Sequence, residues 1–307
     1  MDRLKNRKIL VVGSSNTDMV IKTGHLPRAG ETVLGGTFFM NPGGKGANQA
    51  VAIARLGGQI AFICKTGNDI FGSQAYRLFE EEGIDVSYLF SDAEKPTGVA
   101  LIMVDENGEN CIAVASGANA HLTPGDMATV EKTIEEADFV LMQLEIPIET
   151  VEFVAQKAAG KNRKVILNPA PACVLSKELL QNLYAITPNE TEAELITGIK
   201  ITDEASARKA AERMVESGVD NVVITLGSKG AFVYGGGVCE TVPAPKVKAE
   251  DTTAAGDIFN GALAVALAEE MALPDAVRFA CKAAAISVTR AGAQSSAPYR
   301  HEVNVLS

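Results

Sequence analysis

The chain has 307 residues and a formal net charge of −10 with no basic run, so nucleic-acid binding is not expected. Five scattered cysteines, none in a CxxC pair, indicate reduced thiols rather than a zinc site. The N-terminal apolar run is too short for a signal peptide and no run approaches a membrane span of about 18 residues, which predicts a soluble, cytoplasmic protein.

Strand-like and helix-like segments alternate along most of the chain. The short, nearly continuous apolar runs are typical of strands buried on both faces of a sheet, and they lie at 8–14, 59–67, 138–144, 164–170, 183–189 and 221–227. Apolar residues at helical spacing lie near 46–57, 70–82, 147–160, 203–217, 256–270 and 274–290. This alternation predicts an α/β fold with three layers, α/β/α, around a mostly parallel central sheet.

Two regions do not follow this alternation. Residues 17–41 and 96–116 read as alternating strands joined by turns, and the second contains a Glu-Asn-Gly-Glu turn of hairpin type. We expect them to pair as one small sheet that projects from the main domain. The alternative is that each is a separate hairpin at the edge of the central sheet.

Polar residues follow several of the predicted strands. Because ligands bind outside the carboxyl ends of the strands in an open parallel sheet, these residues are candidates for a site: Asn16, Asp18, Glu145, Asn189, Glu192 and Gly227. Any one of them could instead be a helix cap or a turn former. The segment NPGGKGANQA (41–50) is glycine-rich and leads into a helix, which favours close approach to a ligand or simply a turn with a solvated Lys45.

The segment AEDTTAAGDIFNGALAVAL (249–267) places small residues in front of a helix that begins near Asp257. The amides of residues 254–257 would be unpaired there, with the helix dipole behind them, and small side chains would leave them open to a phosphate. An acid in that position can take a proton from an attacking hydroxyl. The alternative is that Asp257 only caps the helix, which does not explain the small residues or Asp251.

These motifs resemble the ribokinase-like family of sugar and nucleoside kinases. The resemblance rests on GGKGANQA (43–50) and DTTAAGDIFNGAL (251–263), and it extends to QLEIP (143–147), TPNETEAE (187–194), ITLGSKGA (224–231) and VTRAGAQSSAP (288–298). It implies a single kinase domain over residues 1–307, with the two strand-rich regions as a β-sheet lid that also forms a homodimer contact. The implied reaction is ATP-dependent phosphorylation of D-ribose at its 5-hydroxyl, giving D-ribose 5-phosphate. Alternatives are a kinase for deoxyribose or another small sugar, or a non-catalytic sugar-binding relative.

The resemblance also assigns roles to residues, position by position. Asp257 is the implied general base, with the amides of Ala254, Ala255 and Gly256 as the anion hole. The implied sugar-binding residues are Asn16, Asp18, Gly44, Lys45, Gly46, Ala47, Asn48, Glu145 and Asp257. The implied ATP-binding residues are Asn189, Thr225, Leu226, Gly227, Ser228, Lys229, Gly230, Gly256, Asp257 and Cys281. Asn189 and Glu192 would organise Mg²⁺, and an activating K⁺ would be held by Asp251, Thr253, Ser287, Arg290, Gly292 and Ser296.

Overall fold

The central sheet of the computed structural model, which describes residues 7–306, has eight strands. Their order is β14-β13-β12-β11-β10-β9-β1-β4. Six are parallel: β1 (Lys8–Val12), β4 (Gln59–Ile63), β9 (Phe139–Met142), β10 (Lys164–Leu167), β11 (Ala185–Ile186) and β12 (Asn221–Thr225). The other two, β13 (Ala231–Gly235) and β14 (Val238–Val242), run antiparallel at one edge. The prediction of a mostly parallel sheet is confirmed.

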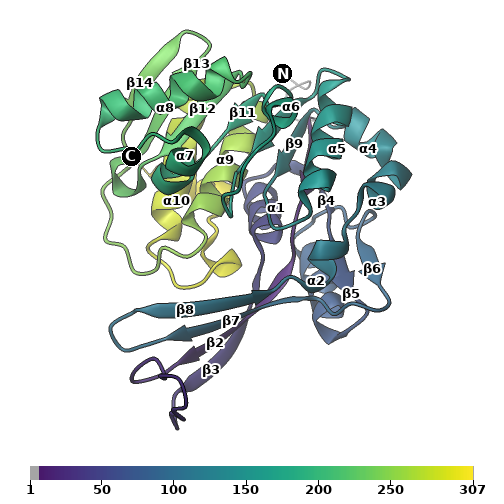
Figure 1. The fold of residues 1–307 in the computed structure, drawn as a ribbon, viewed down its shortest axis with the longest axis vertical. Coiled ribbons are helices and arrows are strands. Elements are labelled where there is room, and N and C mark those ends of the chain that lie inside the picture. Colours follow the sequence, from purple (N-terminus) through teal and green to yellow (C-terminus); the bar gives the residue numbers. More distant parts are fainter. Residues whose placement is uncertain (1–6, 307) are drawn as a thin grey trace.

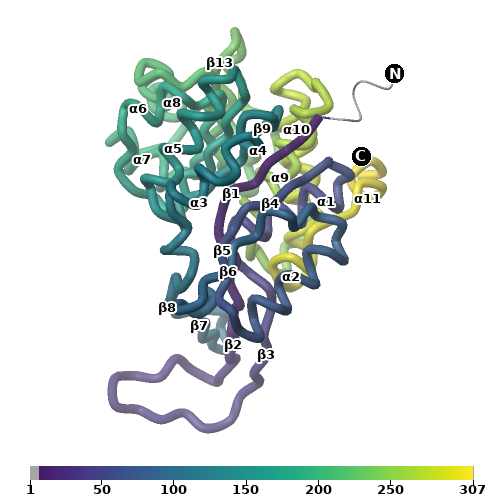
Figure 2. Tube along the Cα trace, turned by 90° about the vertical axis from the view of Figure 1, so that its right-hand side faces the viewer, coloured from purple at the N-terminus to yellow at the C-terminus, as the bar shows by residue number. Residues whose placement is uncertain are grey.

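Helices cover both faces of this sheet and form the outer two layers of the predicted architecture (Figure 2). One layer holds α1 (Lys45–Arg55), α2 (Ile70–Glu81), α9 (Ala255–Ala268), α10 (Leu273–Ser287) and α11 (Arg300–Val305). The other holds α3 (Pro124–Thr129), α4 (Glu131–Glu136), α5 (Ile148–Ala159), α6 (Lys177–Leu180), α7 (Glu190–Thr197) and α8 (Glu204–Glu216). Successive residues of β1 alternate between the two cores, Ile9 and Val11 in one, Leu10 and Val12 in the other. This alternation explains why residues 9–12 of the strand are all apolar.

A second sheet projects away from the three layers (Figure 1). It has four strands in the order β3-β2-β7-β8: β2 (Asn16–Lys22), β3 (Thr37–Gly43), β7 (Gly98–Val104) and β8 (Asn110–Ala115). Strands β2 and β7 are parallel and join the two halves. The prediction that the two strand-rich regions form one sheet is confirmed, and the alternative of separate edge hairpins is wrong. We call this element the small sheet.

Some predicted boundaries were wrong. The apolar run 59–67 is not one strand, because the chain leaves the central sheet after Ile63 and Lys65–Gly67 (β5) pairs with Phe90–Asp92 (β6) instead. The run 183–189 contributes only Ala185–Ile186, since Asn189 already caps α7. The helices α3, α4, α6, α7 and α11 were not predicted. Within residues 7–306, no helix combines the length and apolar character that crossing a membrane requires.

Candidate active site

The glycine-rich loop before α1 packs against the chain that leads out of β1. A Cβ on Gly46 would lie 2.5 Å from the Ser14 amide nitrogen, and one on Gly44 would lie 2.8 Å from that of Asn16. Gly44 also has a φ of +89°, which favours glycine. The sequence suggested that these glycines admit a ligand. In the structure Gly44 and Gly46 allow two segments of the protein's own backbone to meet.

Glu145 holds this junction together from a third segment. Its Oε2 accepts hydrogen bonds from Ser14 Oγ at 2.5 Å and from the Lys45 amide at 3.0 Å. Ser14 Oγ in turn accepts from the Gly46 amide at 3.3 Å. The carboxylate that follows β9 is thereby fixed beside the N-terminus of α1, as the carboxyl-end rule for parallel sheets predicts.

The Lys45 side chain lies among four carboxylates. Burial favours its neutral form and is the largest single influence, but Asp257, Glu145, Glu192 and Asp18 together outweigh it and raise the Lys45 pKa. The lysine therefore remains protonated at neutral pH, and it is not the solvated surface lysine of the alternative interpretation.

Asp18 points from β2 toward the same cluster. Burial, with the charges of Glu145 and Asp257 added to it, raises the pKa of Asp18 to about 6. The space for its carboxyl group exists only because Gly43 has no side chain, since a Cβ there would lie 2.3 Å from both carboxyl oxygens. The ionised form of Asp18 is thus held in an unfavourable environment, as is common at functional sites.

Asp257 is only 5% exposed and lies in the first turn of α9. Its Oδ2 accepts from Asn48 Nδ2 at 2.9 Å and its Oδ1 from Gln49 Nε2 at 3.1 Å. Burial raises the Asp257 pKa, against the lowering effects of Lys45 and these two amides. A raised pKa makes the carboxylate a better proton acceptor than a free aspartate.

Further buried amides, which sequence reasoning missed, support these side chains. Gln49 donates to Asn168 Oδ1 at 3.0 Å and accepts from Gln143 Nε2 at 2.5 Å. Asn119 donates to Asn16 Oδ1 at 2.7 Å and accepts from the Ser15 amide at 2.9 Å. Gln49 lies in GGKGANQA (43–50) and Gln143 in QLEIP (143–147), so the motifs of the resemblance could have pointed to these two residues. Asn119 and Asn168 gave no such signal.

The segment before α9 differs in part from the prediction of four unpaired amides. Ala254 is in the left-handed region, with φ 58°, and starts the helix. The Ala255 amide donates to the Thr252 carbonyl at 3.2 Å, so the prediction for that amide was wrong. Among residues 7–306, no partner is found for the amides of Ala254, Gly256 and Asp257. These three donors are available to an anion at the helix N-terminus.

A cavity of about 480 Å³ opens beside this helix start. Its lining includes Thr225, Gly227, Ser228, Gly230, Gly256 and Cys281 from the predicted ATP-binding set. Apolar side chains including Val247, Phe259 and Val288 complete it. Leu226 packs against the core and Lys229 is exposed, and both lie outside this lining. Burial raises the pKa of the Cys281 thiol to about 11, so Cys281 presents a neutral surface.

Asn189 and Glu192 form a reciprocal cap at the start of α7. Glu192 N donates to Asn189 Oδ1 and Asn189 N donates to Glu192 Oε2, each at 2.8 Å. Burial raises the Glu192 pKa, while the Asn189 amide and the Lys45 charge lower it. The pair therefore caps the helix, as the alternative interpretation held, and also places the Glu192 charge near Lys45.

The predicted cation-binding segments meet beside the start of α9. Asp251 Oδ1 accepts from Thr253 N at 2.9 Å and Thr253 Oγ1 at 2.6 Å, and its Oδ2 accepts from Gly292 N at 2.8 Å. Burial opposes the ionised form, but these hydrogen bonds outweigh it and lower the Asp251 pKa.

The remaining members of the predicted set lie on the same C-terminal segment. Ser287 and Ser296 are buried there. The Ser287 carbonyl accepts from the Arg290 amide at 3.0 Å, and the Arg290 side chain pairs with Glu302.

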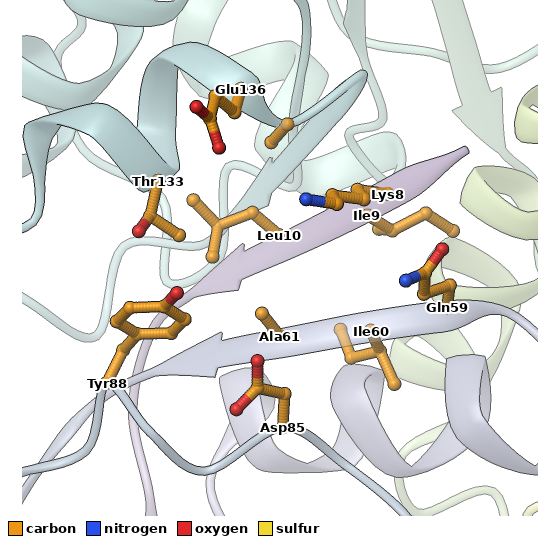
Figure 3. A pocket seen from close by; sticks show the side chains of 11 residues that line it. Lys8, Ile9, Leu10, Gln59, Ile60, Ala61, Asp85, Tyr88, Thr133 and Glu136 are labelled. Carbon is orange, nitrogen blue, oxygen red and sulfur yellow. The ribbon is translucent and has the colours of Figure 1, made fainter. Parts of the chain in front are cut away.

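A second cavity, of about 190 Å³, lies at the other end of the central sheet (Figure 3). It lies over the first residues of β1 and β4, including Leu10 and Ala61, and Tyr88, Thr133 and Glu136 also line it. The predicted site residues gather instead at the carboxyl ends of the strands, which is where ligands bind in folds of this kind. The candidate active site is therefore the cluster around Asp257.

Comparisons with known proteins identify the family of the chain. The sequence pattern of the pfkB family of carbohydrate kinases matches residues 6–300. A ribokinase from Haemophilus influenzae is 48% identical over 296 residues, covering 96% of this chain and 97% of its own.

Two solved structures extend the comparison to the fold. A ribokinase structure from Thermotoga maritima has a TM-score of 0.89 at 43% identity, and covers 97% of this chain and 98% of its own. The structure of an Arabidopsis thaliana ribokinase complexed with ribose and ATP has a TM-score of 0.91 at 32% identity, with 97% of each chain covered. With the family pattern spanning nearly the whole sequence, the chain belongs to the pfkB family of carbohydrate kinases.

Proposed function

We propose that this protein, acting as a single kinase domain, transfers the γ-phosphoryl group of ATP to the 5-hydroxyl of D-ribose. The observation that carries the proposal is the position of Asp257. It lies between an acidic, amide-rich cluster suited to a sugar and the 480 Å³ cavity that includes the preceding Gly256. A single buried acid thus lies where a hydroxyl from one side and a phosphate from the other would meet. Two relatives support this substrate: one is called a ribokinase, and the other is a ribokinase solved in complex with ribose and ATP.

In the proposed reaction Asp257 accepts the proton of the 5-hydroxyl as the oxygen attacks the γ-phosphorus. The bond from that phosphorus to the β,γ-bridging oxygen breaks, and ADP leaves with its electron pair. The free amides of Ala254, Gly256 and Asp257 would stabilise the transferred group at the helix N-terminus. Phosphoryl transfer depends mainly on such positioning and charge stabilisation.

The sugar hydroxyls would be held by carboxylate, ammonium and amide groups. Asp18 and Glu145 accept hydrogen bonds, while Lys45 and Asn48 donate them. Asn16 and Asn48 are each tied to a neighbour, Asn119 and Asp257 respectively, so little conformational entropy is lost on binding. The roles of Gly44, Gly46 and Ala47 are to bring this backbone close to Ser14–Asn16.

The residues present fit a Mg²⁺ ion accompanying ATP. Glu192 uses Oε2 for its cap and, among the described residues, its Oε1 accepts no hydrogen bond, so a hard oxygen remains for the metal or its waters. The backbone amide of Asn189 fixes the orientation of that carboxylate. When bound, Mg²⁺ would neutralise charge on the ATP phosphates. Cys281, Thr225 and the 227–230 turn would line the nucleotide base.

The segments around Asp251 also fit a K⁺ ion, because they combine a carboxylate with main-chain carbonyls of the turn that follows α10. Two donors from Thr253 engage Oδ1 and one from Gly292 engages Oδ2, which leaves one lone pair of Oδ2 for a cation. Ser287, Arg290 and Ser296 would contribute from the adjacent segment. A cation there would order Thr252–Ala254 and so the free amides that follow.

Replacing K⁺ by Na⁺ should therefore lower kcat several-fold, because the smaller ion would leave the segment before α9 less well positioned. Turnover is measured in matched chloride salts at constant ionic strength. Asp251→Asn should remove the difference between the two ions. Equal rates in K⁺ and Na⁺ for the unchanged protein would contradict the K⁺ assignment.

An assay of ADP release over D-ribose, deoxyribose, fructose 6-phosphate and adenosine tests the proposed function itself. We expect the highest kcat/KM with D-ribose, with ribose 5-phosphate as the product. Preference for deoxyribose or another small sugar would change the substrate within the family. Sugar-dependent stabilisation without ADP release would identify a binding protein instead.

Asp18→Asn should stabilise the protein while weakening ribose binding. Asp18 has a folded-state pKa of about 6, above the usual unfolded value of about 3.9, so its ionisation destabilises the folded state as the pH rises between the two. Removing this charge should raise the free energy of unfolding by about 1–3 kcal/mol at pH 8 and by almost nothing at pH 4. Urea unfolding at both pH values measures this. A loss of stability at pH 8 would contradict the burial of an ionised Asp18.

The small sheet supports two further proposals, a lid over the sugar and a homodimer contact. Adjacent strand residues face opposite sides, so the register places Asp18 on one face and Met19 and its partner Leu101 on the other. Leu101 is 56% exposed and Phe38 shares its face, which suits a second copy of the chain. Sedimentation velocity of the full chain decides between dimer and monomer.

The five free cysteines agree with a cytoplasmic location.

A further inference from the structure

A third cavity, of about 240 Å³, lies where the small sheet joins the main domain. Three separate segments line it: the base of β2 and β3, one side of α2, and the 3₁₀ turn Gln294–Ser296 near the C-terminus. Thr17 and its partner Pro42, both in the lining, alternate with Asp18 along β2 and with its partner Asn41 along β3. Asn16 and Asn41, also in the lining, lie on the Asp18 face, so the cavity surrounds the base of the small sheet and reaches Asn16 of the proposed sugar site.

Gln294 gives this cavity its chemical character. Its side chain is 97% buried, being only 3% exposed, yet within the described residues neither Nε2 nor Oε1 has a hydrogen-bond partner. Nearly all buried side-chain amides in folded proteins are paired. A donor and an acceptor buried together without partners thus indicate that another molecule satisfies them.

The position of Gln294 is fixed by its backbone. Arg55 Nη1 donates to the Gln294 carbonyl at 2.9 Å and to the Ala297 carbonyl at 3.0 Å. Arg55 is itself held by Glu82, with two contacts from its Nε at 3.0 and 3.1 Å. The turn is thus tied to both α1 and the end of α2, which holds the backbone of Gln294 beside the cavity.

The rest of the lining defines which molecule fits. It contains no charged side chain, which disfavours phosphates, nucleotides and carboxylates. Phe71, Ala75, Leu78 and Phe79 of α2 provide an apolar wall, and Gln74 and Asn41 add polar groups at the rim. The volume equals that of about eight water molecules. Such a mixture of apolar walls and few polar groups is typical of small-molecule sites.

We propose that this cavity is a binding site for a small uncharged molecule with a carboxamide group on an apolar ring or chain. A primary carboxamide offers one acceptor and one donor side by side, matching the donor and acceptor of Gln294 in two parallel hydrogen bonds. Its apolar part would pack against Phe71 and Leu78. The bound molecule would join the base of the small sheet to α2 and the C-terminal turn, and would therefore stabilise their junction against thermal unfolding.

Benzamide and benzoate are suitable probes, because they share size and ring but differ in charge and in the amide donor. Isothermal titration of the full chain, without nucleotide or sugar, should show one site for benzamide and at least tenfold weaker binding of benzoate. A crystal structure with benzamide should show it paired with Gln294.

Gln294→Met keeps the length of the side chain and removes its hydrogen bonds, so it should weaken benzamide binding at least tenfold. Gln156→Met, on the exposed side of α5, is the matched control and should leave the affinity unchanged. Ala75→Phe should fill the cavity and block benzamide while Gln294 remains. Equal binding of the two probes, unchanged affinity in Gln294→Met, or ordered waters alone on Gln294 in crystals with benzamide would overturn the proposal.

Discussion

Replacing Asp257 with asparagine should lower kcat about 10²- to 10⁴-fold, the usual contribution of a positioned general base. The change removes the proton acceptor but little of the shape. In the unchanged protein Asp257 accepts from Asn48 Nδ2 and Gln49 Nε2, so the new amide must offer one donor where an acceptor stood. Asn48 can accommodate it by rotating its amide, because its Oδ1 is buried without a partner. We therefore expect the fold and ribose binding to be retained.

ADP release and ribose titration together test this prediction. Asp275→Asn is a matched control, since Asp275 is also an acid in the first turn of a helix, α10, but is exposed and pairs with Arg278. It should leave kcat unchanged. In the unchanged enzyme, kcat should fall as the pH drops through a value above the ordinary aspartate range, because burial raises the Asp257 pKa. Turnover within tenfold of the unchanged protein would reduce Asp257 to a helix cap.

Gly46→Ala should destabilise the protein by about 3 kcal/mol or more, at the upper end of overpacking substitutions. An added Cβ would lie 2.5 Å from the Ser14 amide nitrogen and 2.7 Å from the Gly13 carbonyl carbon. Both contacts are with backbone, which cannot move without displacing the end of β1. The Ser14 contacts with Glu145 and Gly46 would be lost with it, so ribose binding should weaken as well.

Urea unfolding measures the effect, and Gly125→Ala provides a control of the same chemical change. Gly125 lies in α3, where a Cβ would meet only Thr123 Oγ1 at 3.5 Å. Alanine is favoured over glycine in helices by about 0.5–1 kcal/mol, so this control should be neutral or slightly stabilising. If Gly46→Ala unfolds at the same urea concentration as the unchanged protein, the close packing of the two backbones is not required.

The layers and the small sheet could be predicted because their signals are local. A strand segment buried on both faces must be apolar, and this property of residues 9–12 is visible without any structure. The break after Ile63 was missed, since the chain returns to strand conformation at Lys65–Gly67 and only the pairing partner shows that it has changed sheets. Local residue types also revealed the helix start at Asp257.

The parts of the site that sequence reasoning missed depend on distant partners. Gln49 contacts Gln143 and Asn168 from about a hundred positions away, and Asn119 reaches Asn16 from a similar separation. A single buried amide side chain leaves no periodic or spacing pattern in the sequence, so its hydrogen-bond partners are known only from the folded structure. The prediction that the Ala255 amide is unpaired was wrong for the opposite reason. A local contact, the hydrogen bond to the Thr252 carbonyl, uses the amide that was expected to bind an anion.

The cluster around Lys45 has a consequence for the order and conditions of binding. Four carboxylates face one ammonium group, so the empty site repels anions at neutral and alkaline pH. A neutral sugar is not repelled by these charges, so its affinity should hardly change with ionic strength. A nucleotide approaches against the repulsion, so its affinity should rise with added salt and depend steeply on divalent cation. The two substrates of one active site would thus respond to the ionic medium in different ways.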